Sequence, residues 1–300
     1  MLFACGRERG IAPLSTDVQA IPIFGLDFTS APSRRKPITC MHCQLKATTL
    51  IVEDCLLFSQ FSAFEDFLQQ PGPWLLACDF PFGQPRQLIT NLHWPTDWSG
   101  YVDVVSNMDK ATFNQLLISY SKERPAGDKL HQRLADRLAH AISPMMMYRI
   151  PVGKMFYEGA PRLLRSGASI LPCYPRSDSR LIIEGYPALV ARRWLGKRSY
   201  KSDERARQTA ELQQARTELL QSLRSPALQD TYGIQLEISS QLCQQLIVDP
   251  MADQLDALLC AIQAAWSYTQ RHQDYGIPRG FDIDGWIVDP LTLQLFSKDS

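Results

Sequence analysis

The stretch WLLACD at residues 74–79 is a continuous apolar run that ends in an acid. A run of this length without polar alternation is typical of a central strand buried on both faces of a sheet. It follows Pro71-Gly72-Pro73, which ends a helical pattern over Ser62–Gln70. We therefore expect residues 74–79 to lie in the middle of a sheet.

Strand candidates upstream and downstream of this run define the fold class. Three of them, Ala20–Asp27, Lys36–Lys46 and Thr48–Leu57, precede it, and the short gap at Ala47 predicts a hairpin between the last two. The strand pattern resumes at Arg180–Glu184. Three antiparallel strands, then helix, strand, insertion, strand and helix form the element order of an α/β, RNase H-like fold with a mixed sheet flanked by helices.

The remaining segments complete this domain organisation. Residues 1–19 show no periodicity and are expected to form an irregular N-terminal extension to one domain over residues 20–300. Residues 84–178 are rich in Pro and Trp and are expected to form a largely helical insertion. The expected helices and the last strand are Lys110–Ser121, Lys129–Ile142, Pro187–Leu195, Asp203–Leu223, Pro250–Gln270 and strand Gly285–Val288.

Composition excludes several classes of protein. The 300 residues are 45% hydrophobic, which supports a sizeable core, and 31 basic side chains balance 31 acidic ones. A nucleic-acid partner would therefore need a local basic patch. No apolar stretch reaches the length of a membrane span, so we expect a cytoplasmic protein without membrane contact. The eight cysteines are scattered, and Cys40 and Cys43 have zinc-like spacing without a second pair, so free thiols are expected.

Acids end three of the predicted strands. Asp27, Asp79 and Glu184 each close an apolar run, and parallel neighbouring strands would bring them to one edge of the sheet. Gly25 and Gly83 beside them would leave room for a substrate to approach the backbone. A single acid after a strand is more often a turn or cap residue, or the partner of an arginine, so only their combination argues for a site.

A late helix adds two further acids. Asp249 and Pro250 fit the N-cap and first position of the helix, which places Asp253 and Asp256 on neighbouring turns. Their side of the helix carries small apolar residues, which predicts that they face another protein layer where their charge must be offset. Several carboxylates at one place would repel each other unless cations joined them. A pair of divalent ions, Mg²⁺ or Mn²⁺, would satisfy them and support hydrolysis at phosphorus.

Short motifs along the chain carry a family resemblance. They are Gly25–Pro32, Asp79–Gly83, Val152–Lys154, Glu184–Ala188, Tyr200–Lys201, Asp253–Leu258 and Gly285–Ile287. In this order they resemble the domain of unknown function family 429, a family of predicted RNase H-like nucleases, and the Asp-x-x-Asp-Ala helix is similar to that of RuvC-type resolvases. Asp284, where Glu is expected, departs from the pattern.

The resemblance implies roles for particular residues. It implies metal binding and catalysis by Asp27, Asp79, Glu184, Asp253 and Asp256. It also implies phosphate contacts for Lys154 and Lys201.

Lys201 lies in a basic segment between positions 192 and 207, in which Trp194 and Tyr200 are interleaved. Such a composition suits backbone phosphates and base stacking, although a solvated surface explains it equally well. The nucleic-acid contacts expected here and just after the first strand are Arg34, Arg35, Arg192, Arg193, Lys197, Arg198 and Lys201.

The leading hypothesis is thus a metal-dependent nuclease that acts on DNA or RNA. Two alternatives stay open: a non-catalytic module that binds nucleic acid or protein, and a small-molecule phosphotransferase on the same fold. The sequence has no glycine-rich phosphate loop, which disfavours the last.

Overall fold

The computed structural model describes residues 20–299, and the extension expected over residues 1–19 lies outside them. Within this range seven strands form one sheet in the order β5-β6-β4-β1-β2-β3-β7. The strands are β1 (Ile21–Asp27), β2 (Ile38–Lys46), β3 (Thr49–Phe58), β4 (Trp74–Asp79), β5 (Ser169–Ile170), β6 (Arg180–Glu184) and β7 (Gln235–Glu237). The first three are antiparallel neighbours, and β4 and β6 continue the sheet in parallel with β1. This mixed α/β sheet confirms the expected RNase H-like class.

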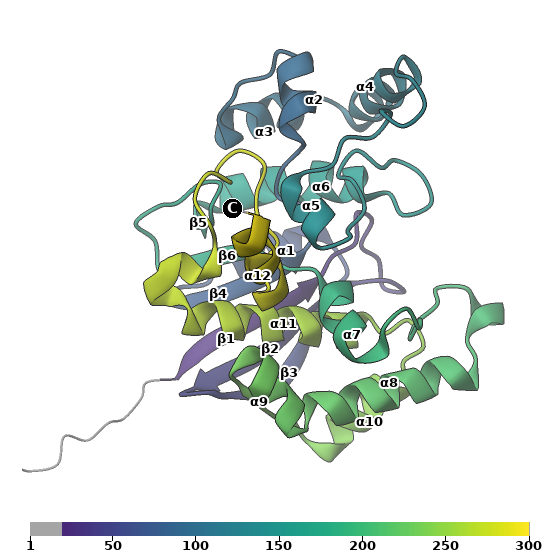
Figure 1. Cartoon of the computed structure of the whole chain (residues 1–300), viewed down its shortest axis with the longest axis vertical. Coiled ribbons are helices and arrows are strands. Elements are labelled where there is room, and N and C mark those ends of the chain that lie inside the picture. The colour runs from purple at the N-terminus through teal and green to yellow at the C-terminus, as the bar shows by residue number, and fades with distance from the viewer. Residues whose placement is uncertain (1–19, 300) are drawn as a thin grey trace, which may run out of the picture.

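Helices cover both faces of the sheet, which explains why β4 is apolar throughout. Helix α11 (Asp253–Thr269) lies across one face, and α1 (Phe61–Leu68) and α6 (Val152–Ser166) lie behind the other (Figure 1). Each face has its own hydrophobic core, to which Leu75 and Leu76 of β4 contribute alternately. The prediction that residues 74–79 form a central, doubly covered strand is confirmed.

The insertion after β4 is largely helical, as expected. It contains α2 (Arg86–Asn91), α3 (Trp98–Ser106), α4 (Lys110–Lys122), α5 (Leu134–Leu138) and α6, of which α2, α3 and α4 lie at the top of Figure 1. Two boundaries differ. β5 falls inside the predicted range but joins the edge of the sheet. The helix expected over residues 129–142 shrinks to α5, because the Asp136 carboxylate caps its start at the Arg133 N–H and His140 ends it with a φ of 49°.

The C-terminal third contains α7 (Pro187–Leu195), α8 (Ala210–Leu223), α9 (Pro226–Tyr232), α10 (Ser240–Val248), α11 and α12 (Pro290–Asp299). The predicted bounds of α7 are confirmed, whereas α8 begins seven residues after the predicted start at Asp203. α9, α10, α12 and β7 were not predicted. The strand expected at residues 285–288 is reduced to one bridge between Glu184 and Ile287.

The predicted start of the acidic helix was wrong. Asp249 follows the last residue of α10, and its side chain accepts a hydrogen bond from the Met251 N–H at 3.1 Å. The N-cap of α11 is Ala252, with a φ of 59°. Asp253 and Asp256 nevertheless lie in the first turn of α11, where the helix dipole favours negative charge.

Two further expectations concern the cysteines and the membrane. Cys40 and Cys43 belong to the cores on opposite faces of the sheet, so they do not form a zinc pair. The cysteines of the described part of the chain are free.

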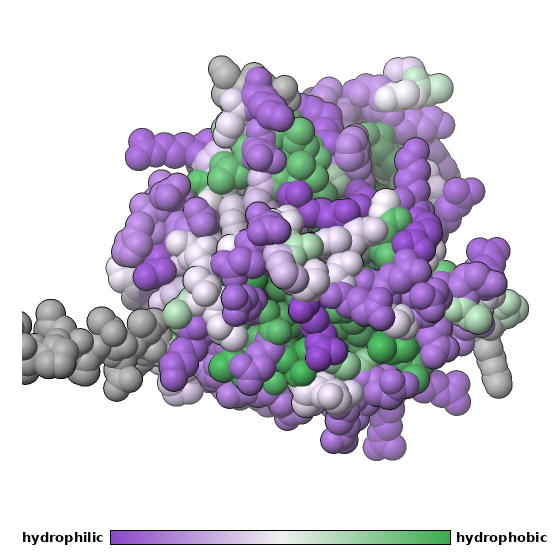
Figure 2. All heavy atoms as spheres, turned by 60° about the horizontal axis from the view of Figure 1, so that its bottom comes forward, coloured by the Kyte–Doolittle hydropathy of each residue, from purple (hydrophilic) through white to green (hydrophobic). Residues whose placement is uncertain are grey.

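Between residues 20 and 299 no helix has the length and hydropathy to cross a bilayer. Figure 2 shows apolar areas on one face that are separated by hydrophilic side chains.

Candidate functional site

Strand register places two of the predicted acids side by side. Asp27 and Asp79 are directly paired positions at the ends of the parallel strands β1 and β4. Ile23 and Leu75 lie four residues before them and pack in the core under α11, so alternation directs both acids to the α11 face. Glu184 at the end of β6 follows Ile182, which packs in the opposite core. Glu184 therefore points to the other face of the sheet.

Gly25 lets α11 approach β1 closely enough to bring Asp256 over these strand ends. A Cβ at Gly25 would lie 2.1 Å from both the Ala257 carbonyl oxygen and the Ala261 nitrogen. The space expected there for a substrate is thus filled by the helix. The same correction applies to Gly83, where a Cβ would lie 2.6 Å from the Asp284 carbonyl oxygen.

Asp256 is fully buried and held by two neighbours from the segment between α7 and α8. The Tyr200 hydroxyl donates a hydrogen bond to Oδ1 at 2.5 Å, and the Lys201 ammonium contacts Oδ2. Although burial disfavours the ammonium, the charges of Asp256, Asp27 and Asp79 raise the pKa of Lys201. Lys201 therefore supplies part of the positive charge that was expected to balance the buried acids of this helix.

Asp27, Asp79, Asp253 and Asp256 constitute what we call the acidic cluster. Asp27 is only 7% exposed and Asp253 only 9%. Within the described residues, neither of them nor Asp79 has a hydrogen bond or ion pair through its carboxylate. All other buried carboxylates in that part of the chain are partnered, as Asp136, Glu184, Asp284 and Asp289 show. Among the described residues, the buried acids without a partner thus lie in the cluster.

Burial and mutual repulsion disfavour charge in the acidic cluster. Burial, followed by the charge of Asp256, raises the pKa of Asp27 well above its ordinary value and that of Asp79 to about 7. Burial also raises the pKa of Asp253, against the opposing charge of Lys36. As the side chains stand, no group of three or more His, Cys, Asp or Glu residues within positions 20–299 is arranged to hold a metal ion.

The raised pKa of Asp79 predicts a pH-dependent stability in the absence of metal. Between about pH 4 and pH 7 the folded protein holds a proton on Asp79 that the unfolded chain has released, so this residue makes stability fall as pH rises. The gain in unfolding free energy from Asp79→Asn should therefore grow across this interval and level off above about pH 7. Urea unfolding of both proteins in EDTA at a series of pH values measures this gain. A gain that is the same at every pH would contradict the prediction.

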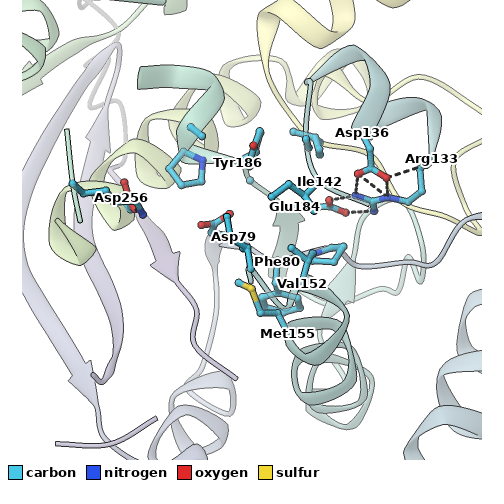
Figure 3. Close-up of a pocket in the computed structure, with 18 of the residues that line it drawn as sticks. Asp79, Phe80, Arg133, Asp136, Ile142, Val152, Met155, Glu184, Tyr186 and Asp256 are labelled. Carbon is cyan, nitrogen blue, oxygen red and sulfur yellow. Dashed lines mark hydrogen bonds and ion pairs between the residues drawn. The ribbon is translucent and has the colours of Figure 1, made fainter. Parts of the chain in front are cut away.

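Glu184 forms a separate, fully buried ion network with a residue that was not predicted. Arg133 donates to Glu184 Oε1 from Nη2 at 2.6 Å and to Oε2 from Nη1 at 2.8 Å. The same guanidinium binds Asp136, and the Phe82 N–H donates to Glu184 at 2.9 Å. Figure 3 shows this network on the far side of Asp79 from Asp256. The structure thus neutralises Glu184 with an arginine and does not bring it into the acidic cluster, as had been expected.

Glu184→Gln tests whether this residue is structural. We expect a loss of about 2–3 kcal/mol in unfolding free energy, because Arg133 would keep Asp136 but lose one buried charged partner. Mn²⁺ affinity, measured by titration calorimetry, should not change. A large drop in affinity with unchanged stability would instead make Glu184 a metal ligand.

A cavity of about 220 Å³ opens beside the acidic cluster. Asp79, Asp256 and Lys201 line one side of it, and Figure 3 shows Phe80, Ile142, Val152 and Met155 around the rest. Ile150, which also lines the cavity, is 56% exposed, and the nearby Tyr148 is 60% exposed. The cavity thus combines an acidic end with apolar walls.

The basic side chains expected to contact nucleic acid divide into two groups. Arg192 donates to the Ala139 carbonyl and the Tyr186 hydroxyl, and Arg193, Arg198 and Lys201 form ion pairs with acids of this chain. Within the described residues the others have no ion pair, and most are exposed: Arg34, Arg35, Lys197 and the half-buried Lys154. The ring of Tyr200 is buried, so it offers no face for base stacking. The expected basic patch is therefore smaller than the sequence indicates.

Comparison with known proteins gives a family without a described activity. A family model with the description "Protein of unknown function (DUF429)" matches residues 25–273. No curated protein and no solved structure matches the chain. The matched range includes the whole acidic cluster.

Proposed function

The chain belongs to the DUF429 family, and from its acidic cluster we propose that it is a hydrolase that uses Mg²⁺ or Mn²⁺ to cleave phosphodiester bonds in nucleic acid. The observation on which the proposal rests is that the buried Asp27 and the partly buried Asp79, at the ends of β1 and β4, have unpaired carboxylates. Burying an ionised carboxylate without a partner is costly, so such groups persist where a ligand compensates them.

The donor chemistry of the cluster fits a hard divalent cation. Mg²⁺ and Mn²⁺ prefer carboxylate oxygens, and Asp27 keeps its carboxylate without any hydrogen bond inside the protein. Asp27 and Asp79 would hold the ion, next to Asp256, whose two oxygens are bonded to Tyr200 and Lys201. A bound ion would supply Lewis-acid stabilisation of the negative charge that develops on the phosphate.

Protein groups around the cluster have defined tasks in this proposal. The Tyr200 hydroxyl fixes the orientation of Asp256, and the Arg133–Glu184 pair forms part of the cavity wall. Lys201 places a positive charge where the cavity meets the cluster, which favours an anionic substrate. The phosphate would thus be bound between the ion and the protein.

The cavity favours one unpaired nucleotide over an intact duplex. Its volume of about 220 Å³ is below the common range for sites that take drug-sized ligands, so it accommodates little more than one ring system beside the phosphate. Phe80 and Met155 supply apolar contacts for a base, and Tyr148, an exposed residue two positions before Ile150 of the cavity, is available for stacking. Arg34, Arg35 and Lys197 are exposed and would interact with flanking phosphates.

A cleavage assay tests the proposal. Purified protein is incubated with labelled single-stranded, duplex and branched DNA and RNA, and with the small phosphodiester bis(p-nitrophenyl) phosphate, in Mg²⁺, Mn²⁺ or EDTA. We expect cleavage that requires the ion and that is fastest on substrates with unpaired nucleotides. Binding of nucleic acid without cleavage in any metal would favour the non-catalytic alternative.

A further inference from the structure

We propose that Lys201 occupies one of two cation positions in the acidic cluster, so that the native protein binds a single divalent ion and uses the ammonium as the second positive charge. The inference rests on the proposed metal-dependent function and concerns how the site is divided between the protein and its ion. The sequence alone led to two other expectations: that the acids bind a pair of ions, and that Lys201 contacts phosphate.

The first argument for this inference comes from the contacts of Asp256. This carboxylate is fully buried, and each of its oxygens already has a donor: the Tyr200 hydroxyl on Oδ1 and the Lys201 ammonium on Oδ2. In sites that hold two ions about 4 Å apart, a shared carboxylate binds one ion through each oxygen. The ammonium therefore takes a position that a second ion would need, and like charges exclude each other there.

The second argument comes from the negative charges around Lys201. Lys201 lines the same cavity as Asp79 and Asp256. The charges of Asp256, Asp27 and Asp79 all favour its ammonium form and raise the pKa of Lys201. The ammonium is a compact point charge that can replace a small cation among carboxylates. Among the described residues, the carboxylates of Asp27 and Asp79 have no other ionic partner, which leaves them available for one ion.

Hydrogen bonds fix the backbone on both sides of Lys201, and this is the third argument for the inference. The buried Arg216 donates from Nη1 to the Tyr200 carbonyl at 2.8 Å, and the Ser202 N–H donates to the Pro250 carbonyl at 3.2 Å. These bonds tie the segment that carries Lys201 to α8 and to the residues just before α11. The ammonium is thus a built component of the cluster, and an ion would have to break this arrangement to displace it.

Counting bound ions tests the inference. Mn²⁺ bound to the full-length protein is measured by equilibrium dialysis and by electron paramagnetic resonance, which distinguishes an isolated Mn²⁺ from a coupled pair. We expect one isolated ion per chain in the native protein and a coupled pair in Lys201→Met, whereas Lys201→Arg should retain one ion. Lys122→Met, which removes an exposed lysine at the end of α4, should bind one isolated ion as the native protein does.

The possible outcomes separate the inference from its premise. Two ions in the native protein, or one ion in a folded Lys201→Met, would overturn the inference while the proposed function stands. No bound Mn²⁺ in any of the proteins would overturn both. Circular dichroism and the melting temperature establish that each variant is folded, and Lys201→Gln replaces Lys201→Met if the latter does not fold.

Discussion

Gly25→Ala is expected to prevent the protein from folding to a stable state, with a loss of more than about 5 kcal/mol in unfolding free energy. The added Cβ would lie 2.1 Å from two backbone atoms of α11, and a backbone cannot yield as the end of a flexible side chain can. Either α11 separates from β1 or the central sheet distorts, and both changes disrupt the largest core of the molecule. Expression yield, circular dichroism and urea unfolding measure the effect.

Gly185→Ala is the matched control for this prediction. Its Cβ would meet the side chains of Gln263 and Cys260 of the same helix at 3.1 and 3.2 Å, so small adjustments suffice. We expect a loss of about 1 kcal/mol, within the ordinary range of single substitutions. Equal losses for the two variants would mean that close approach of α11 at Gly25 does not hold the fold together.

The parts of the fold that the sequence predicts are those set by local patterns. β1 and β4 are apolar runs with an acid at the end, so both their burial and the position of Asp27 and Asp79 follow from composition alone. The small apolar neighbours of Asp256 correctly indicated that it faces another protein layer. The order of β1 to β4 along the chain follows from the same patterns.

The parts that the sequence does not predict depend on contacts between distant residues. Glu184 ends an apolar run just as Asp79 does, and only the register of β6 shows that it points to the other face. Its partner Arg133 lies 51 residues away in a loop, and no local pattern connects the two. In the same way, the sequence predicts that Lys201 binds phosphate. Its contact with Asp256 could not be predicted, because it forms only when α8 and α11 are in place.

Asp27→Asn is expected to abolish metal-dependent cleavage while making the metal-free protein more stable. Loss of a carboxylate that would hold the ion should lower kcat/KM on the order of 10³-fold or more, as for other residues that act as part of one catalytic unit. Burial raises the pKa of Asp27 well above its ordinary value, so at pH values above the ordinary pKa of an aspartate this residue lowers the stability of the folded protein. An uncharged amide of the same shape removes that cost.

The metal-free Asp27→Asn protein should be more stable than the native protein at pH 8 in EDTA, by about 1 kcal/mol, the ordinary size of a single-substitution effect. Saturating Mn²⁺ should reverse the order, since the ion stabilises only the protein that binds it. Melting temperatures in EDTA and in Mn²⁺, together with the cleavage rate, measure both effects, and Asp230→Asn, at an exposed position on α9, is the control. A native protein that gains nothing from Mn²⁺ and a fully active Asp27→Asn would together remove the basis for a metal at the end of β1 and β4. An inactive variant that is more stable only without the ion would instead explain why the chain retains a destabilising acid in its core: the carboxylate lowers the stability of the empty site and binds the ion when it is present.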